Sequence, residues 1–325
     1  MAKMEFKKWV SILFIVFVLS SVFPGYATPK ILSPEEAFPL VRRIAEQAMS
    51  KTYWGVWEIK NYGLRKHEFY EVFCYENLGF GWKKLGNQEV FHASMGGYRY
   101  VFDLVAQEVK GVYPSYGLSF SPLKEEDVNL ILENYLIDFQ NNRLFLFSRY
   151  NGMIVSSFEF DEEGFLLSHF SYFPDGKVRK EGRFIYRDFS PEYGQLSPYF
   201  ELMERFAESG RETMDIATAE RKRIFLPRLL PPGFDLRRVY VAKSGGNQFY
   251  YLLYSDGLQY FLITQSAYPR VSSPSLSLRP ILVQREEENV VLVGEKEGFY
   301  LSFMGNVDPE IGSQILRSLE REGGF

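Results

Sequence analysis

Two stretches decide the fold of the C-terminal third: LLPPGF at residues 229–234 and YYLLYSDGL at residues 250–258. The first is a turn rich in proline and glycine, and the second is an aromatic and aliphatic strand that ends in Asp256-Gly257, a pair typical of hairpin turns. Ser255 precedes Asp256, but neighbouring side chains on a strand point apart, and no histidine follows residue 230. We therefore predict a β-hairpin here and not a reaction centre.

The N-terminus has the form of an export signal. Lys3, Lys7 and Lys8 precede an apolar run at residues 9–19, and the small residues Gly25 and Ala27 flank the bulky Tyr26. A charged region, a short apolar region and a small-residue cleavage site are typical of secretory signal peptides. We predict cleavage after Ala27 and a periplasmic location. An uncleaved anchor is the alternative, but the run is shorter than the roughly 20 apolar residues that span a bilayer.

The composition argues against several classes of function. The chain carries a net charge of −4, which becomes −6 when residues 1–27 are removed. Nucleic-acid-binding proteins need clustered Lys and Arg, so we expect no nucleic-acid partner. Cys74 is the only cysteine, so the chain forms no intramolecular disulfide. Its place in an aromatic strand predicts a small core residue.

The segment from residue 51 to residue 188 predicts one curved antiparallel sheet that carries two helices. A capping box at Ser33–Glu36, with proline at the first helical position, opens the first helix. Runs of alternating apolar residues follow, and short turns such as Asn151-Gly152 separate them. Strands joined by such turns are antiparallel neighbours. A second helix is expected from Ser121-Pro122 to about Tyr135.

The chain is predicted to be α+β and to consist of two domains after the signal peptide at residues 1–27. Residues 28–188 form the domain of the curved antiparallel sheet with its helices. Residues 189–230 are expected to be a linker with a charged helical stretch from Tyr199 to Arg223. Residues 231–325 form a smaller α+β domain, whose strands are followed by a terminal helix that Asp308-Pro309-Glu310 opens.

No motif in the chain carries catalytic chemistry. The three histidines, at positions 67, 92 and 169, lack partners at metal-ligand spacing, whereas a zinc site needs three or four ligands. There is no G-x-S-x-G elbow, Walker loop or dinucleotide fingerprint. We therefore expect no catalytic residue, no metal, no cofactor and no enzyme, although folding alone can bring together the paired carboxylates of a carbohydrate hydrolase. The acidic run at residues 161–164 predicts a turn and not a cation loop, because the alternating oxygen ligands are missing.

Aromatic residues are abundant, with 30 Phe, 22 Tyr and 4 Trp, and many alternate along the predicted sheet. A sheet lined with rings either fills a core or encloses an apolar ligand. Ordinary core is the default interpretation, and a cavity for a lipid or acyl chain is the alternative. The candidate lining residues of such a cavity are Tyr98, Tyr100, Phe102, Phe145, Phe147, Phe158 and Phe160.

Basic residues gather around the predicted linker of this otherwise acidic protein. A solvated helix face is the simpler interpretation of the cluster. The alternative is a surface that binds an anionic head group or an acidic segment of a partner. The candidate partner-binding residues are Arg221, Arg223, Arg237 and Arg238, and Lys222 and Arg228 lie beside them.

The C-terminal part resembles the MucB/RseB family of periplasmic regulators of envelope-stress sigma factors. The resemblance covers roughly 95 residues and rests on the order of its elements. These are the PPGF turn at residues 231–234, the strand that ends in YSDGL at 254–258, the strand at 259–265, and the block Gly305–Glu310 with its helix.

Upstream, Lys51–Val56 and the hairpins at residues 160–167 and 175–176 look similar to the N-terminal domain of the same family. The resemblance implies a half-barrel related to the lipoprotein carriers LolA and LolB, with an apolar cavity that senses lipid. It also implies that the second domain binds the periplasmic segment of a membrane-spanning anti-sigma factor and shields it from proteolysis.

The leading hypothesis is an exported, non-enzymatic regulator that senses lipid through its first domain and binds an anti-sigma factor through its second. A periplasmic lipid or lipoprotein carrier of the LolA type is the alternative, and it would need only the first domain for acyl-chain binding. An envelope hydrolase is a third hypothesis, which a search for turnover of exported substrates would test.

Overall fold

The computed structural model describes residues 29–325 except 49, 77, 88, 96–97, 115–122, 124–126, 207–211, 215–223, 245–246, 268–280, 287–288, 306 and 322–325. The predicted signal peptide and its cleavage site, at residues 1–27, lie outside the described residues. Among the helices that are described, none has the length and apolar character needed to cross a membrane.

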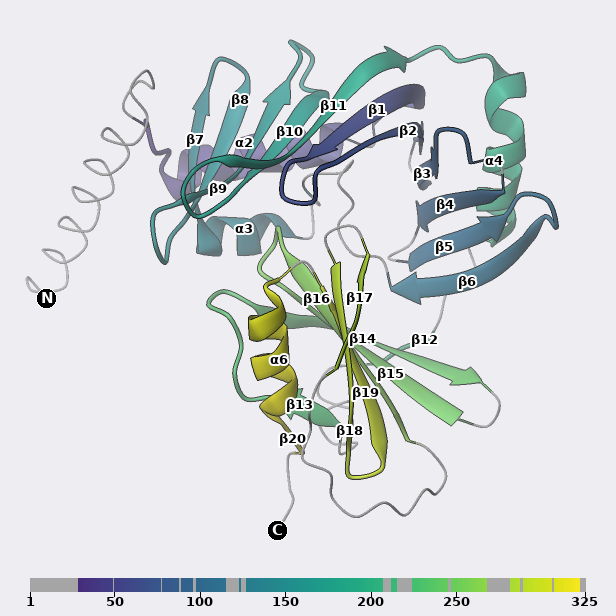
Figure 1. The fold of residues 1–325 in the computed structure, drawn as a ribbon. Coiled ribbons are helices and arrows are strands. Elements are labelled where there is room, and N and C mark those ends of the chain that lie inside the picture. The colour runs from purple at the N-terminus through teal and green to yellow at the C-terminus, as the bar shows by residue number, and fades with distance from the viewer. Residues whose placement is uncertain are drawn as a thin grey trace, which may run out of the picture.

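The first sheet of the described chain has eleven antiparallel strands and occupies the upper half of Figure 1. Its order is β6-β5-β4-β3-β2-β1-β11-β10-β9-β8-β7, so β1 and β11 pair in the middle while β6 and β7 lie at the two ends of the order. The chain runs outward from β1 to β6, crosses to the other end, and returns from β7 to β11. The strands are β1 (Tyr53–Asn61), β2 (Lys66–Tyr75), β3 (Gly79–Lys84), β4 (Val90–Met95), β5 (Tyr98–Asp103), β6 (Glu108–Pro114), β7 (Tyr135–Gln140), β8 (Arg143–Ser148), β9 (Ile154–Phe160), β10 (Leu166–Tyr172) and β11 (Val178–Asp188).

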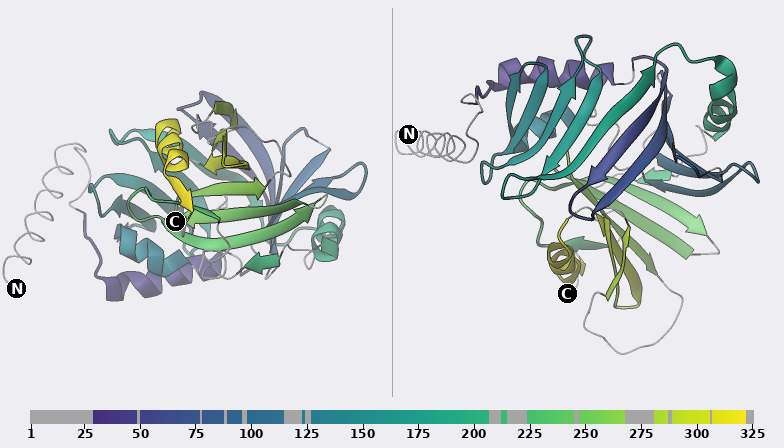
Figure 2. Two further views of the ribbon diagram at one scale, coloured as in Figure 1. Left: turned by 90° about the horizontal axis from the view of Figure 1, so that it is seen from below. Right: turned by 45° about the horizontal axis from the view of Figure 1, so that its top comes forward.

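Helices α2 (Pro34–Gln47) and α3 (Val128–Asn134) contact each other and cover one face of this sheet, which we call the helix face (Figures 1 and 2). The predicted capping box is present: the Ser33 Oγ accepts from the Glu36 N–H at 3.3 Å, and the Glu36 carboxylate accepts from the Ser33 N–H at 2.9 Å. The core beneath the helices includes Val41, Ile131, Trp57, Val72, Leu144 and Phe158.

Helix α3 is shorter than the sequence indicated. Asp127 is its N-cap, and Leu123, inside the predicted helix, has no regular structure and is buried in the core of the helix face. The helix ends at Asn134 because Tyr135 adopts an extended conformation and begins β7. The predicted start at Ser121-Pro122 lies outside the described residues.

Helix α4 (Tyr193–Phe206) lies in the predicted linker and packs on the other face of the first sheet, near β3, β4 and β5. Leu196, Leu202 and Met203 share a buried cluster with Phe73 and Phe91 there, and the Tyr199 ring lies 4.6 and 4.8 Å from the rings of these two phenylalanines. The predicted helical stretch from 199 to 223 is wrong in extent, since the helix begins earlier, ends at Phe206, and is followed by strand β12 (Glu212–Met214).

The second sheet contains seven strands in the part of the chain that is described, in the order β12-β14-β15-β16-β19-β18-β17. Helix α6 (Pro309–Arg317) packs on one face of it, and Asp308 caps this helix by accepting from the Glu310 N–H at 2.8 Å. The predicted terminal helix is thus confirmed. The remaining strands are β14 (Asp235–Ser244), β15 (Asn247–Ser255), β16 (Tyr260–Ala267), β17 (Ile281–Glu286), β18 (Asn289–Lys296) and β19 (Phe299–Gly305), and a separate pair is formed by β13 (Phe225–Pro227) and β20 (Leu319–Arg321).

The two sheets share a core. Val239 and Leu252 point toward α6, whereas the alternate residues Tyr240 and Leu253 belong to a cluster with Tyr98 of the first sheet. The second sheet is therefore packed between α6 and the first sheet. The predicted α+β class with a large open antiparallel sheet is confirmed, while the division into domains at residues 188 and 230 stays a prediction.

Candidate functional site

Three of the aromatic residues proposed for a lipid cavity lie between the two sheets. Tyr98, Tyr100 and Phe102 alternate along β5 and are buried, with at most 7% exposed. The ring of Tyr98 meets the ring of Tyr240 at 5.2 Å between centroids in an edge-to-face contact. These three side chains therefore help to hold the second sheet against the first.

The other four aromatic candidates lie at the opposite end of the first sheet. Phe158 and Phe160 belong to the core of the helix face. Phe145 and Phe147 are also buried, but they alternate with two leucines of that core, so they point to the opposite face. The seven candidates occupy three separate places, and lipid binding by any of them stays a prediction.

A polar group missed at the sequence level lies within the helix face. His169 stacks on Phe158 at 4.6 Å between ring centroids, and its Nε2 lies 3.3 Å from the hydroxyl of Ser156. Burial lowers the pKa of His169 to about 3, so the imidazole is neutral at pH 7. The only signal that the sequence offers for this arrangement is that one of its few histidines lies on a strand of alternating apolar and polar residues.

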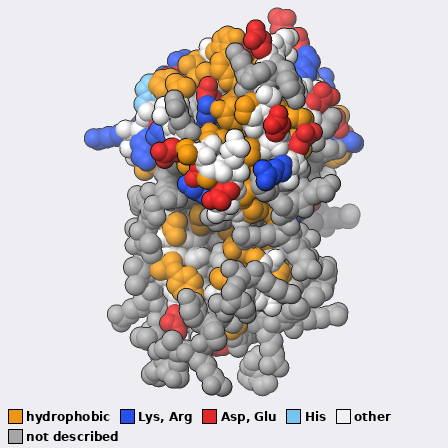
Figure 3. All heavy atoms as spheres, turned by 90° about the vertical axis from the view of Figure 1, so that its right-hand side faces the viewer, with side chains coloured by type: hydrophobic (Ala, Val, Ile, Leu, Met, Phe, Trp, Pro, Cys, Tyr) orange, Lys and Arg blue, Asp and Glu red, His pale blue; other side chains and the backbone are white. Residues whose placement is uncertain are grey.

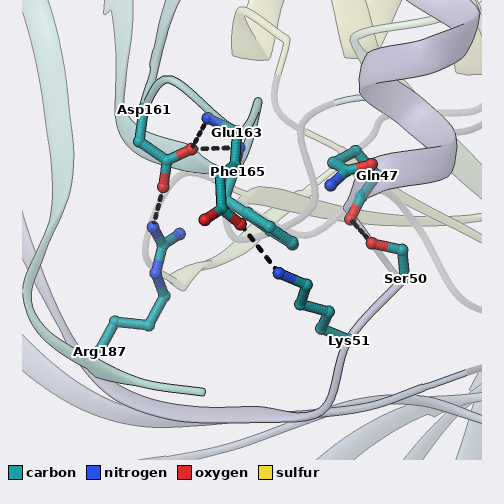
Figure 4. A network of polar contacts seen from close by, with 7 residues as sticks. All are labelled: Gln47, Ser50, Lys51, Asp161, Glu163, Phe165 and Arg187. Carbon is teal, nitrogen blue, oxygen red and sulfur yellow. Dashed lines mark hydrogen bonds and ion pairs between the residues drawn. The ribbon is translucent and has the colours of Figure 1, made fainter.

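Charged and aromatic side chains form a cluster close to the C-terminal end of α2, beside the turn between β9 and β10 (Figure 4). The Arg187 Nη2 donates to the Asp161 carboxylate at 2.6 Å, and its guanidinium stacks over the Phe189 ring at 4.6 Å. Lys51 donates to Glu163 at 2.8 Å and also lies over the Phe165 ring. This cluster joins the turn between β9 and β10 to the segment between α2 and β1.

The acidic run at residues 161–164 is a turn, as its sequence indicated. One oxygen of Asp161 accepts from the N–H groups of Glu163 and Phe165 at 3.1 and 2.8 Å, and Gly164 has a φ of +93°. The other oxygen is taken by Arg187. Among the described residues no group of three or more His, Cys, Asp or Glu side chains could hold a metal ion.

The basic candidates are not gathered on one described surface. Arg237 forms an ion pair with Asp127 at 3.6 Å, and Arg228 forms one with Glu320. Arg238 lies partly buried on β14, and Arg221 and Arg223 lie outside the described residues. From the side of α4, the space-filling view shows hydrophobic side chains intermixed with acidic and basic ones (Figure 3). Partner binding by these arginines stays a prediction.

The two turns that decide the C-terminal fold both reach the first sheet. Asp256 begins the tight turn between β15 and β16, where its carboxylate accepts from the N–H groups of Leu258 and Gln259 at 2.9 and 2.7 Å. Leu258 packs against the core of the helix face. Gly233 of the PPGF turn lies against Asn134 at the end of α3. Sequence reasoning found the turns but not this contact.

The fold thus defines an α+β protein of two sheets that share one core. No family model matches the sequence, and no curated protein matches it. Among solved structures, the chain is similar to MucB in complex with MucA(peri), with 13% identity over 89% of this chain and 100% of that chain and a TM-score of 0.48. It is also similar to the Pseudomonas aeruginosa MucA/MucB complex, with 14% identity, coverage of 89% and 99%, and a TM-score of 0.49.

A LolA superfamily protein from Nitrosomonas europaea matches a smaller part of the chain. The identity is 10%, the match covers 49% of this chain and 96% of that chain, and the TM-score is 0.27. MucB gives its name to the family that the C-terminal part of the sequence resembles. The function proposed below starts from that resemblance and from the order of the elements in this chain.

Proposed function

We propose that the protein is an exported, non-enzymatic regulator that binds the extracytoplasmic segment of a membrane-anchored anti-sigma factor. The observation that supports this most is the order of the elements: an open sheet with two helices on one face, the PPGF turn, and a second sheet with a terminal helix. This order carries the resemblance to the MucB/RseB family. MucB is bound to MucA in the complexes named above, and the transfer of that role to this chain is part of the proposal.

The partner would contact the basic residues before and at the start of β14. We assign this role to Arg221, Arg223, Arg237 and Arg238, and an acidic segment would compete with Asp127 for Arg237. An acidic segment would be attracted to such a surface over several ångströms, and salt would weaken this attraction.

Lipid sensing by the first sheet is a finer part of the same proposal. Side chains of α2 and α3 already pack on the helix face, and Leu258 adds to them. An acyl chain that enters this core must displace some of these side chains, since protein interiors are close-packed. Lipid sensing therefore requires movement of a helix or of the second sheet.

Binding to candidate segments tests the main proposal. Protein without residues 1–27 is titrated by calorimetry with the extracytoplasmic segments of the single-pass anti-sigma factors of the same organism. We expect one segment to bind, and we expect the variant Arg221→Ala/Arg223→Ala/Arg238→Ala to bind it at least about tenfold more weakly.

The control is Arg42→Ala on α2, which removes a half-exposed arginine that pairs with Glu46 at 2.8 Å. This variant should bind as the wild type does. If no segment binds at low salt, the regulator hypothesis fails. If the triple variant binds unchanged, the segment binds elsewhere on the molecule.

A further inference from the structure

Asn134, the last residue of α3, connects both turns of the second sheet to the first sheet. Its Nδ2 donates to the Gly233 carbonyl and to the Asp256 carbonyl, each at 3.1 Å. Its Oδ1 accepts from the Tyr150 hydroxyl at 2.7 Å. Asn134 is 5% exposed, and its bond to the Asp256 carbonyl is buried. The two bonds that its Nδ2 donates depend on the exact position of the second sheet.

The neighbouring residue adds a second polar contact between the sheets. The Tyr135 hydroxyl donates to the Asp256 carboxylate at 2.6 Å. Asp256 is 7% exposed, and its burial raises the pKa of the carboxyl above the ordinary value. A buried carboxylate is costly unless hydrogen bonds satisfy it, so Asp256 favours the arrangement in which Tyr135 faces it.

Two glycines let the turns approach α3 this closely. Gly233 and Gly257 have φ values of +84° and +101°, which other residues rarely adopt. A Cβ atom at Gly233 would lie 2.4 Å from the Asn134 Oδ1, and one at Gly257 would lie 2.8 Å from the Ile131 Cγ1. The turns therefore fit α3 in shape as well as in hydrogen bonding.

Two further contacts join the second sheet to the first part of the chain. Arg237 of β14 forms an ion pair with Asp127, the N-cap of α3, at 3.6 Å. The other contact is apolar: Tyr240, Leu253 and Leu262 share a buried cluster with the aromatic residues of β5. Apolar contacts are non-directional, so they tolerate rotation of one surface on another, whereas a hydrogen-bonded contact is either made or broken. The second sheet also has its own core with α6, which does not include the turn at Asp256 and Gly257.

We propose that Asn134, Tyr135 and Asp256 form a latch between the sheets, which opens as a unit while the second sheet turns on the apolar cluster at β5. In the closed state Leu258 packs against the core of the helix face. Opening withdraws Leu258 and Gly257 from α3 and exposes Ile131. The latch thus controls access to the helix face from the side of the second sheet.

Distance measurements between two spin labels test the latch. The labels are placed at Lys177→Cys, on the turn before β11, and at Glu297→Cys, on the turn between β18 and β19; the native Cys74 is buried and does not interfere. We expect the full-length mature protein to give a main population at the label distance of the closed state and a minor population at that of the open state. Asn134→Ala should raise the ratio of the open to the closed population at least about tenfold, because the hydrogen bonds of Asn134 are lost. Asn151→Ala, in the turn between β8 and β9, is the control.

Hydrogen exchange of the unsubstituted protein keeps the test independent of how well the variant folds. The N–H groups of Leu258 and Gln259 donate to the Asp256 carboxylate within its own turn, which becomes exposed to solvent when the latch opens. They should therefore exchange by local opening at least about tenfold faster than the most protected amides of β1. Equal protection of these amides and of β1, or an unchanged distance distribution in folded Asn134→Ala, would overturn the proposal.

Discussion

The imidazole of His169 lies between the ring of Phe158 and the hydroxyl of Ser156 in the core of the helix face. Its pKa is about 3 in the native state because burial disfavours the charged form, whereas an unfolded chain has a histidine pKa of about 6.5. The stability that His169 contributes is fully present above pH 6.5. It is lost as the pH falls toward 3, since the unfolded state then binds a proton that the native state does not.

The pH dependence of unfolding tests this assignment. Between pH 7 and pH 5, His169 alone should lower the free energy of unfolding by about 2 kcal/mol. His169→Phe keeps the stacking on Phe158 and removes the titratable group. When unfolding is measured in urea, the free energy of unfolding of this variant should therefore fall by about 2 kcal/mol less between pH 7 and pH 5 than that of the wild type. The variant is less stable than the wild type at pH 7 because Ser156 loses a partner, and this difference shrinks or reverses by pH 5 because only the wild type carries the histidine. An identical difference between pH 7 and pH 5 in both proteins would contradict the assignment.

Single residues were predictable where local chemistry decides their role. Cys74 is fully buried, as its aromatic surroundings indicated, and burial raises the pKa of its thiol. Asp161 and Asp256 form turns, as the acidic and Asp-Gly motifs indicated. The partner of Arg237 was not predictable, because Asp127 lies far away in the sequence and reaches it only through the packing of the two sheets.

At the scale of elements, α2 shows how a local signal defines a helix end. Ser33 and Glu36 cap it reciprocally, and Pro34 begins it. Ser33→Ala should lower the free energy of unfolding by about 1 kcal/mol, because the Glu36 N–H loses its side-chain acceptor. Chemical denaturation measures the change. Ser50→Ala, just beyond the other end of the helix, is the matched control and should have a smaller effect; equal losses would show that the cap is not the cause.

The strands and their turns followed from the sequence because short turn motifs and alternation act within a few residues. The limits of α3 and α4 did not. Tyr135 fits the apolar pattern of a helix, yet it is the first residue of β7, because the backbone of Tyr135 pairs with that of Ser148 in β8. Glu212–Met214 lies in a charged stretch typical of a helix, but it pairs with β14. Pairing with a distant strand outweighs local preference in both cases.

At the scale of the whole molecule, the shared core predicts that the two parts do not fold independently. Tyr240, Leu253 and Leu262 bury one face of the second sheet against the first. A large apolar side chain contributes about 1.5 to 3 kcal/mol when it is fully buried, so separation of the parts exposes a costly surface.

Expression of residues 29–206 and 207–325 as separate fragments checks this. Each fragment should unfold at a lower temperature than the intact protein and should bind a hydrophobic dye, and mixing the fragments should reduce dye binding. Calorimetry and dye fluorescence provide the measurements. Two fragments that unfold at the temperature of the intact chain would show that the shared core is dispensable. Such a result would also favour the carrier hypothesis, in which the first part binds acyl chains alone.

The sequence by itself determined the α+β class, the antiparallel strands, the turns at Gly233 and Asp256, and the caps of α2 and α6, because each depends on residues within a few positions of one another. Only the tertiary structure decided where the aromatic residues of β5 lie, what Arg237 contacts, and that both turns meet Asn134. These features depend on the packing of one sheet on another. Such packing brings together residues that are a hundred or more positions apart in the chain, as Asn134 and Asp256 are, and no local pattern records it.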